Sequence, residues 1–327
     1  MLSTRRFAYR DASIPSDNLA IRVAASVEVG VEESFAASST SPRVNTQPSS
    51  FKNHSFRAVT RGVSRRINAC ELTYRSREQI DYKKAASQLE EYCQLLQKWN
   101  VDLIAMPAND TYPDGCFVQD TAIILDEVCV MASMGAEARR GEISEVERMV
   151  SQFRSIQRII PPATLDGGDV VQFGKRLFVG LSTRTNARGI AALSQIVETF
   201  GYTVVPIRLC GGLHLTTGCG IVNDETVLLN TRWVDASAFR GLRKLHVPEE
   251  EPWAANTIRV EDAVCLEAQA PRTVDLVQPY VGTIDTLDIS EFRKAEGSLS
   301  CLSLIYKEAL HKQHGTNMGG VGNGKPR

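Results

Sequence analysis

The sequence predicts an α/β protein built from five repeated units in a ring, each running strand, strand, helix, strand. The first observation is a hairpin pattern, two short apolar runs around a two-residue polar turn, which recurs about every 38 to 50 residues. The second is a helical pattern with apolar residues at three-to-four spacing after several hairpins. The third is a further strand-like run after each of these helices.

Four of the hairpins are complete within the sequence. Their paired runs lie at 121–125 with 128–132, 170–173 with 177–180, 220–222 with 226–229, and 257–260 with 263–266. A fifth copy is split between a strand at 301–306 and a strand at 56–60. The two ends of the repeated region are therefore expected to meet and close the ring.

The helices fall between the hairpins and the strands that follow. Residues 82–99 and 143–156 each carry one apolar stripe. A third helix is expected from near Asn186 until Gly201, which follows Phe200 as a helix-stopping glycine. The strands after the helices are expected at 103–106, 159–161, 203–205 and 283–287.

Composition favours a globular enzyme. The chain has 327 residues, 43% of them hydrophobic, which is enough for one large domain or two smaller ones. Its 37 basic and 38 acidic residues are interspersed and indicate neither a nucleic-acid nor a membrane partner. No apolar run approaches the roughly 18 to 20 residues that span a bilayer, and no segment has the order of a secretory signal. We expect a cytoplasmic enzyme with a small-molecule substrate.

The two ends of the chain differ from the middle. Residues 1–52 hold ten serines and little apolar periodicity, so we expect a disordered extension. The start MLSTRR is compatible with an organelle presequence, but the acidic residues that follow make it a poor one. We expect residues 53–310 to form the catalytic domain and the glycine-rich 311–327 to form a flexible tail.

The eight cysteines are dispersed, with no C-x-x-C pair. Such spacing favours buried free thiols over a disulfide framework. Cys and His residues do not cluster as they do in a zinc site, so we expect neither a metal nor a cofactor.

Four residues that lie far apart in the sequence carry the groups needed for nucleophilic attack on a guanidinium carbon. Cys301 supplies a thiol, His214 an imidazole, and Asp120 and Asp166 carboxylates. Taken alone, Cys301 and His214 are typical of apolar strands in a core. Asp166 alone is typical of a tight turn. Because a free thiol is mostly protonated near pH 7, Cys301 would need a neighbouring cation, either the substrate or protonated His214.

At these positions the chain resembles the dimethylarginine dimethylaminohydrolases, guanidine-modifying enzymes of the pentein fold. The resemblance covers about residues 55–306 and rests on EGSLSCLSL around Cys301, GLHL around His214, LDGGD at Asp166 and FVQD ending at Asp120. It implies a pentein α/β propeller, five pseudo-symmetric ββαβ units around a central active site. It also implies that Cys301 is the nucleophile and that His214, oriented by Asp166, protonates the leaving amine and activates water.

The resemblance further implies roles in substrate binding. Asp120 would clamp the guanidinium plane through paired hydrogen bonds. Asp114 would reach the substrate's amino-acid end or its amines, and Arg139 and Arg184 would bind its α-carboxylate. Leu72 would lie on a flexible lid, while Asp169 is expected to be structural.

Gln119 departs from the family pattern, which usually has glutamate there. An amide removes a negative charge, so we expect a pocket more tolerant of neutral, urea-like substrates. The implied reaction is cofactor-free hydrolysis of Nω-methylated arginine to citrulline and an alkylamine, through a covalent thiouronium intermediate. The alternatives are an arginine deiminase, an amidinotransferase, a hydrolase of a neutral substrate, or a non-catalytic protein that binds arginine derivatives. We expect a monomer or homodimer.

Overall fold

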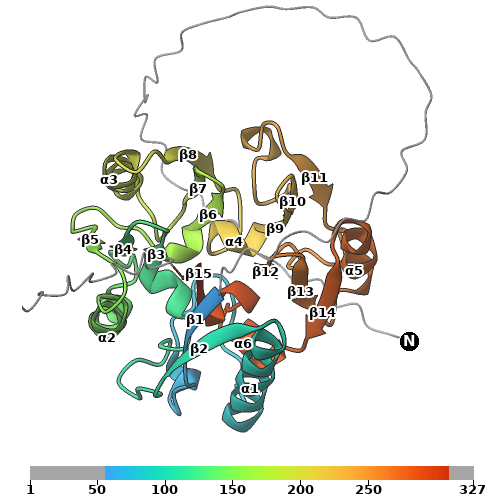
Figure 1. The fold of residues 1–327 in the computed structure, drawn as a ribbon. Helices are drawn as coiled ribbons and strands as arrows, with labels where there is room; N and C mark the ends of the chain where they lie inside the picture. The colour runs from blue at the N-terminus through green and yellow to red at the C-terminus, as the bar shows by residue number, and fades with distance from the viewer. Residues whose placement is uncertain (1–55, 309–327) are drawn as a thin grey trace, which may run out of the picture. The chain divides into compact units, whose positions relative to one another are not determined.

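The computed structural model describes residues 56–308. The predicted extension at 1–52 and tail at 311–327 lie outside these residues. Within them, five three-stranded sheets surround a common centre, with α1, α2, α3 and α5 on the outer side (Figure 1). No helix in this part of the chain combines the length and apolar character needed to cross a membrane.

Each sheet repeats one pattern, an antiparallel pair followed by a parallel third strand. The sheets are β15 (Leu304–Lys307), β1 (Phe56–Arg61) and β2 (Val101–Met106); β3 (Ala122–Ile124), β4 (Cys129–Met131) and β5 (Ile156–Arg158); β6 (Val170–Phe173), β7 (Arg176–Leu181) and β8 (Thr203–Arg208); β9 (Cys219–Asn223), β10 (Thr226–Leu229) and β11 (Arg243–His246); and β12 (Ile258–Val260), β13 (Ala263–Glu267) and β14 (Thr283–Leu287). The predicted split unit is present, because β15 and β1 form its antiparallel pair.

The helices connect the second and third strands of four units. They are α1 (Tyr82–Lys98), α2 (Ile143–Val150), α3 (Ala187–Glu198) and α5 (Pro271–Val277). The fourth unit has only a short 3₁₀ turn, Ala236–Ala238, at this place. Two further short helices, α4 (Leu215–Gly218) and α6 (Ser290–Lys294), precede β9 and β15.

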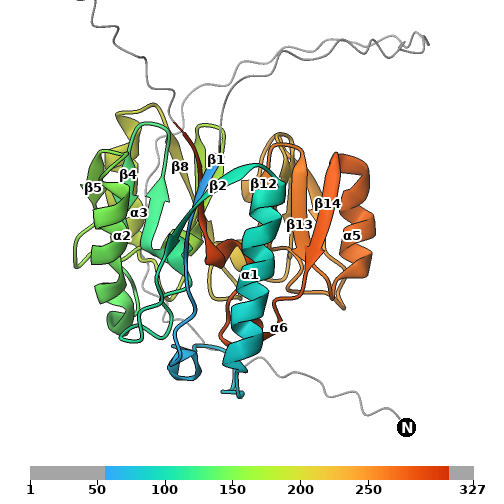
Figure 2. The same ribbon diagram turned by 60° about the horizontal axis from the view of Figure 1, so that its bottom comes forward.

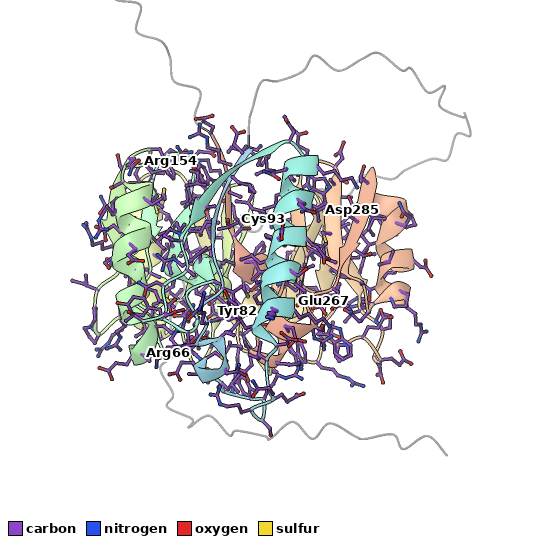
Figure 3. The ribbon with its side chains drawn as sticks, turned by 90° about the horizontal axis from the view of Figure 1, so that it is seen from below. Arg66, Tyr82, Cys93, Arg154, Glu267 and Asp285 are labelled. Carbon is purple, nitrogen blue, oxygen red and sulfur yellow. The ribbon has the colours of Figure 1, made fainter. Side chains whose placement is uncertain are left out.

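The apolar stripe of α1 faces the core as expected, with Ala85, Leu89, Tyr92 and Leu96 buried. Figure 2 shows α1 lying along the outside of β1 and β2. Its last turn is tied to the neighbouring sheet, since Lys98 and Trp99 both donate hydrogen bonds to Asp285 on β14. Figure 3 labels Asp285 on β14 and Cys93 on α1.

The expected third helix is also present. Asn186 caps α3 by accepting a hydrogen bond from the Gly189 amide. Gly201 adopts the left-handed conformation, φ 77°, that favours glycine after a helix.

Two boundaries were predicted wrongly around α2. The helix ends at Val150, and the strand expected at 159–161 is β5, three residues earlier. Phe153 leaves the helix to stack on Tyr306, with ring centroids 4.9 Å apart. The Arg154 guanidinium fixes the turn by donating to the carbonyls of Leu125 and Lys307. These tertiary contacts end the helix at Val150, although the apolar helical spacing continues in the sequence beyond it.

The strand predicted at 301–306 begins only at Leu304, because Leu299–Leu302 form a 3₁₀ turn. The same arrangement recurs around the ring, where short turns precede the first strands of the units. These turns are Val118–Thr121 before β3, Gly167–Asp169 before β6, α4 before β9 and Leu299–Leu302 before β15. They bring the residues with predicted chemistry to the centre.

Candidate active site

One pocket gathers most of the predicted site residues. Its lining is Glu71, Asp114, Phe117, Asp120, Arg139, Arg184, Leu213, His214, Ala295, Glu296, Gly297 and Cys301. Asp166 lies directly behind His214 and is fully buried. The structure therefore brings the thiol, the imidazole and both carboxylates to one place, although they are separated by up to 181 residues in sequence.

His214 lies between two carboxylates. Its Nε2 is 3.1 Å from Asp166 Oδ2, and its Nδ1 is 3.6 Å from Asp120 Oδ1. The expectation that His214 lies on a strand was wrong, because it is the capping residue at the start of α4. Its backbone amide donates to Thr217 Oγ1 and its carbonyl accepts from the Thr217 amide, which fixes the turn.

The two carboxylates decide the charge of His214. Burial disfavours the charged ring, but Asp120 and the hydrogen-bonded Asp166 outweigh it and raise the pKa of His214 from 6.5 to about 9. His214 is therefore an imidazolium at neutral pH and can donate a proton. Asp166 is held in turn by the Gly135 amide, which donates to its Oδ1 at 2.8 Å.

Asp169 supports this arrangement without reaching the pocket. Its Oδ1 accepts from the Leu215 amide at 2.9 Å, and its Oδ2 accepts from Ser182 Oγ at 2.6 Å. Burial raises the pKa of Asp169 to about 6, although His214 opposes this shift. The contacts agree with the structural role expected for Asp169, because they anchor the residue that follows His214.

Cys301 is buried in the 3₁₀ turn, where its Sγ accepts a hydrogen bond from the Ser298 amide at 3.4 Å. Burial and the Asp120 carboxylate raise the pKa of Cys301 to about 12. Without substrate, the residue is therefore a thiol, and a cation must bind beside it before it can act as a nucleophile.

Arg139 is placed differently from its expected role. Its Nη1 donates to Asp120 Oδ2 at 2.7 Å, and its Nε and Nη2 donate to Glu142 at 3.0 and 2.9 Å. A further bond from Nη2 goes to the Phe117 carbonyl at 3.2 Å. All three guanidinium nitrogens are occupied by the protein, so Arg139 buttresses Asp120. Burial opposes ionisation of Asp120, but His214 and Arg139 outweigh it and lower the pKa of this carboxyl.

Arg184 lines the pocket with part of its hydrogen-bonding capacity unused. Its Nη2 donates to Thr73 Oγ1 at 3.0 Å, but its buried Nη1 has no hydrogen-bond partner. An unpaired buried guanidinium nitrogen is costly unless a ligand satisfies it. Asp114, also in the pocket, accepts from the Glu71 amide at 3.0 Å. Burial raises the pKa of Asp114.

Leu72 is half-buried and packs against the core, so it does not line the pocket. The backbone after it is held by Glu296, whose carboxylate accepts from the amides of Thr73, Tyr74 and Arg75 at 2.9, 2.6 and 2.6 Å. The sequence analysis gave Glu296 no role. A positive φ of 59° is the unusual feature at this residue, and the sequence does not reveal it.

Gln119 is not in the pocket. Its Oε1 accepts from Ser300 Oγ at 2.9 Å, and its side chain lines a separate cavity bounded by β3, β6 and β15. Successive residues of the turn point to opposite sides, so Asp120 faces the pocket and Gln119 faces away. The amide therefore does not change the charge of the pocket wall in the way the sequence suggested.

Comparison with known proteins agrees with this geometry. The family model described as N,N dimethylarginine dimethylhydrolase, eukaryotic, matches residues 56–233. A N(G),N(G)-dimethylarginine dimethylaminohydrolase from Pseudomonas aeruginosa is 34% identical over 69% of this chain and 90% of its own. The chain belongs to the dimethylarginine dimethylaminohydrolase family. A Streptomyces coelicolor relative of the same name is 32% identical over 78% of this chain and 98% of its own.

Solved structures of known proteins have the same fold as this chain. The Pseudomonas aeruginosa enzyme, as a cysteine-to-serine mutant complexed with citrulline, superimposes with a TM-score of 0.74 at 32% identity, over 76% of this chain and 98% of that one. The N-terminal domain of a cyanobacterial arginine dihydrolase has a TM-score of 0.68 at 16% identity, over 78% and 98%, a likeness of fold alone. The predicted pentein α/β propeller is confirmed. Among residues 56–308, no group of three or more His, Cys, Asp or Glu side chains could hold a metal ion.

The raised pKa of His214 predicts a specific pH dependence of stability. Because the folded-state pKa lies above the unfolded value of 6.5, ionised His214 stabilises the fold fully below pH 6.5. This contribution is lost as the pH rises through about 9. We expect His214→Gln to lower the free energy of unfolding more at about pH 6 than at about pH 10. Urea denaturation at both pH values would measure this.

His246, exposed on β11, provides the matched control. His246→Gln should leave the free energy of unfolding close to that of wild type. An equal destabilisation by His214→Gln at both pH values would contradict the imidazolium between the two carboxylates.

Proposed function

We propose that this protein hydrolyses Nω-methylated L-arginine, dimethylarginine above all, to citrulline and the corresponding amine. The observation that carries the proposal is the convergence of Cys301, His214 and Asp120 on one pocket in a chain of this family. Relatives named dimethylarginine dimethylaminohydrolase at 32–34% identity favour this reaction over the deiminase, amidinotransferase, neutral-substrate and binding-protein alternatives. The reaction is that of a hydrolase acting on C–N bonds.

Binding of the cationic substrate is the first step. Asp120 accepts the guanidinium, since a carboxylate offers about four lone-pair sites and two hydrogen-bond donors, Arg139 and the Gly168 amide, use only some of them. The guanidinium charge beside Cys301 lowers the pKa of its thiol and releases the proton to solvent. His214 cannot take this proton, because it is already protonated.

Covalent chemistry follows from this charge state. The Cys301 thiolate adds to the guanidinium carbon, and the C–N bond to the methylated nitrogen breaks as His214 transfers its proton to the leaving amine. This leaves a thiouronium on Cys301 and a neutral imidazole. Water then loses one proton to His214 and adds to the same carbon, and the C–S bond breaks as the remaining hydroxyl proton passes to the Cys301 sulfur, which gives citrulline and the thiol of the free enzyme. Asp166 holds the His214 ring in orientation throughout.

The α-carboxylate end is assigned to Arg184, whose unpaired Nη1 supports this role. In this proposal Asp114, which lines the same pocket, accepts hydrogen bonds from the substrate's amines. Leu72 and the following backbone, held by Glu296, are proposed to form the lid over this end. Arg139 acts on the substrate through Asp120. Gln119 has no direct contact in this proposal.

Cys301→Ser should abolish citrulline release from dimethylarginine, because a hydroxyl cannot replace a stabilised thiolate. We expect residual activity below about a hundredth of wild type. Colorimetric citrulline detection with dimethylarginine and with arginine would measure this and test the substrate class. Cys210→Ser, at the exposed cysteine, is the control and should keep full activity. Turnover by Cys301→Ser close to that of Cys210→Ser would exclude this nucleophile.

Arg184→Gln should raise KM for dimethylarginine about ten- to hundredfold, as expected for a hydrogen bond to a charged group worth roughly 1.5–3 kcal/mol. The penalty should be absent for the decarboxylated analogue of dimethylarginine, which has no group for Arg184 to bind. Steady-state kinetics with both substrates measure this difference. Arg188→Gln, at an exposed position on α3, is the matched control. An equal penalty on both substrates would remove Arg184 from the carboxylate site.

The cytoplasm is the proposed location. All eight cysteines lie within the described residues and are free, which fits a reducing compartment. Fractionation of cells that express the full chain would test it, and recovery in an organelle or secreted fraction would contradict it. A monomer or homodimer remains the prediction for the assembly.

A further inference from the structure

The fifth unit contributes no residue to the pocket. The segment before β12, at the place where the other units carry their functional turns, contains Asn256, which is only 1% exposed. This segment is firmly held. Thr257 Oγ1 donates to the Ile221 carbonyl at 3.0 Å, and a Cβ at Gly220 would lie 2.3 Å from the Ala255 carbonyl oxygen, so β9 packs directly against it.

The Asn256 side chain joins the two segments that carry the nucleophile and the general acid. Its Oδ1 accepts from the Ser300 amide at 3.0 Å, directly before Cys301. Its Nδ2 donates to Ser300 Oγ and to the Thr216 carbonyl, both at 2.8 Å. Thr216 lies two residues after His214. The one acceptor and both donor hydrogens of this amide are therefore used in a buried site.

These bonds are part of a closed circuit through all five units. Ser300 Oγ, next to β15, donates to Gln119 Oε1 in the unit that begins with β3. The next residue in the chain, Asp120, accepts from the Gly168 amide at 3.2 Å in the unit that begins with β6. The Gly168 carbonyl accepts from Thr216 Oγ1 at 2.9 Å, which leads to the fourth unit and back to Asn256. Asn256 is the link through which the fifth unit joins.

We propose that Asn256 is a positioning residue that sets the placement of Cys301 relative to His214 by linking the two turns through its side-chain amide. The inference rests on the proposed function, in which Cys301 attacks a carbon whose leaving group His214 protonates. Both transfers require the two side chains to keep a fixed geometry about that carbon, and a misplacement of about 1 Å can cost about a hundredfold in rate. The substrate's carboxylate end, at Arg184, does not depend on this link.

The chemistry of the site requires an amide. A carboxylate at position 256 would still accept from the Ser300 amide, but it has no hydrogen to donate and would place an oxygen against the Thr216 carbonyl. The bond between the two turns would then be replaced by repulsion. Asn256→Asp changes no volume, and so it tests the link without creating a cavity.

The experiment compares Asn256→Asp with Asn230→Asp and with wild type in dimethylarginine turnover. Asn230 is a matched control, since it is also buried, donates to the Pro252 carbonyl at 2.6 Å and accepts from the Arg232 amide at 3.0 Å. We expect Asn256→Asp to lower kcat about ten- to hundredfold with KM within about threefold of wild type. Asn230→Asp should lower the melting temperature while keeping kcat.

Ser300→Ala perturbs the hydrogen bonds around Asn256 without the negative charge that Asn256→Asp introduces. It removes one of the Asn256 bonds and the bond to Gln119 without introducing a carboxylate, and we expect a two- to fivefold loss in kcat, roughly that of one neutral hydrogen bond. If Asn256→Asp does not fold, Asn256→Ser, which removes the amide that joins the two turns and adds no charge, decides the matter with the same expected loss in kcat.

Wild-type kcat in a folded Asn256→Asp, or in Asn256→Ser, would overturn the inference. So would an equal fall in kcat in Asn230→Asp, which would reduce the effect to general destabilisation. Absence of citrulline release by the wild-type enzyme would instead refute the proposed function, so the two failures are distinguishable.

Discussion

The buried imidazolium of His214, held between two carboxylates, is the interaction on which the centre of this protein depends. A charge removed from water must be compensated by near neighbours, and Asp120 and Asp166 provide that compensation from two different units of the ring. Each carboxylate is itself held, Asp120 by Arg139 and the Gly168 amide, Asp166 by the Gly135 amide. The pocket is thus a connected set of charges whose members cannot move independently.

This connectedness explains why the free enzyme holds its nucleophile as a thiol. Burial and the Asp120 carboxylate, one of the two that keep His214 charged, raise the pKa of Cys301, so Asp120 stabilises the imidazolium and disfavours the thiolate at the same time. In the proposed mechanism, a guanidinium that binds beside Asp120 lowers the pKa of Cys301, and a neutral molecule does not. The enzyme would then select a cationic substrate in two ways, because a cation binds to the carboxylates and also promotes deprotonation of Cys301.

Much of the architecture could be predicted because the hairpins are local patterns. Alternating apolar runs around two polar residues locate four of the hairpins, and the paired ends β15 and β1 complete the fifth. The end of α2 could not be predicted, because Phe153 and Arg154 are fixed by Tyr306 and Lys307 from the far end of the chain. The short turns at the centre escape prediction for the same reason.

The candidate site, like the fold, could be predicted from the sequence only in part. Motifs located Cys301, His214, Asp120 and Asp166, because their side chains are distinctive in those segments. They did not show that Gln119 faces Ser300, since neighbouring residues of a tight turn point in opposite directions. The Glu296 carboxylate accepts hydrogen bonds from three backbone amides of a distant segment, and such contacts leave no pattern in the sequence.

The pairing of β15 with β1 has a consequence for how the enzyme is made. A ribosome delivers Asp120, Asp166 and His214 long before it delivers Cys301, which precedes the strand that completes the first sheet. Until that strand emerges, the nascent chain holds an acid and its carboxylates but no nucleophile, and β1 has an open edge. The proposed nucleophile and the strand that closes the ring are therefore synthesised together at the end of translation, so under the proposed function chains that terminate before Cys301 are expected to be inactive.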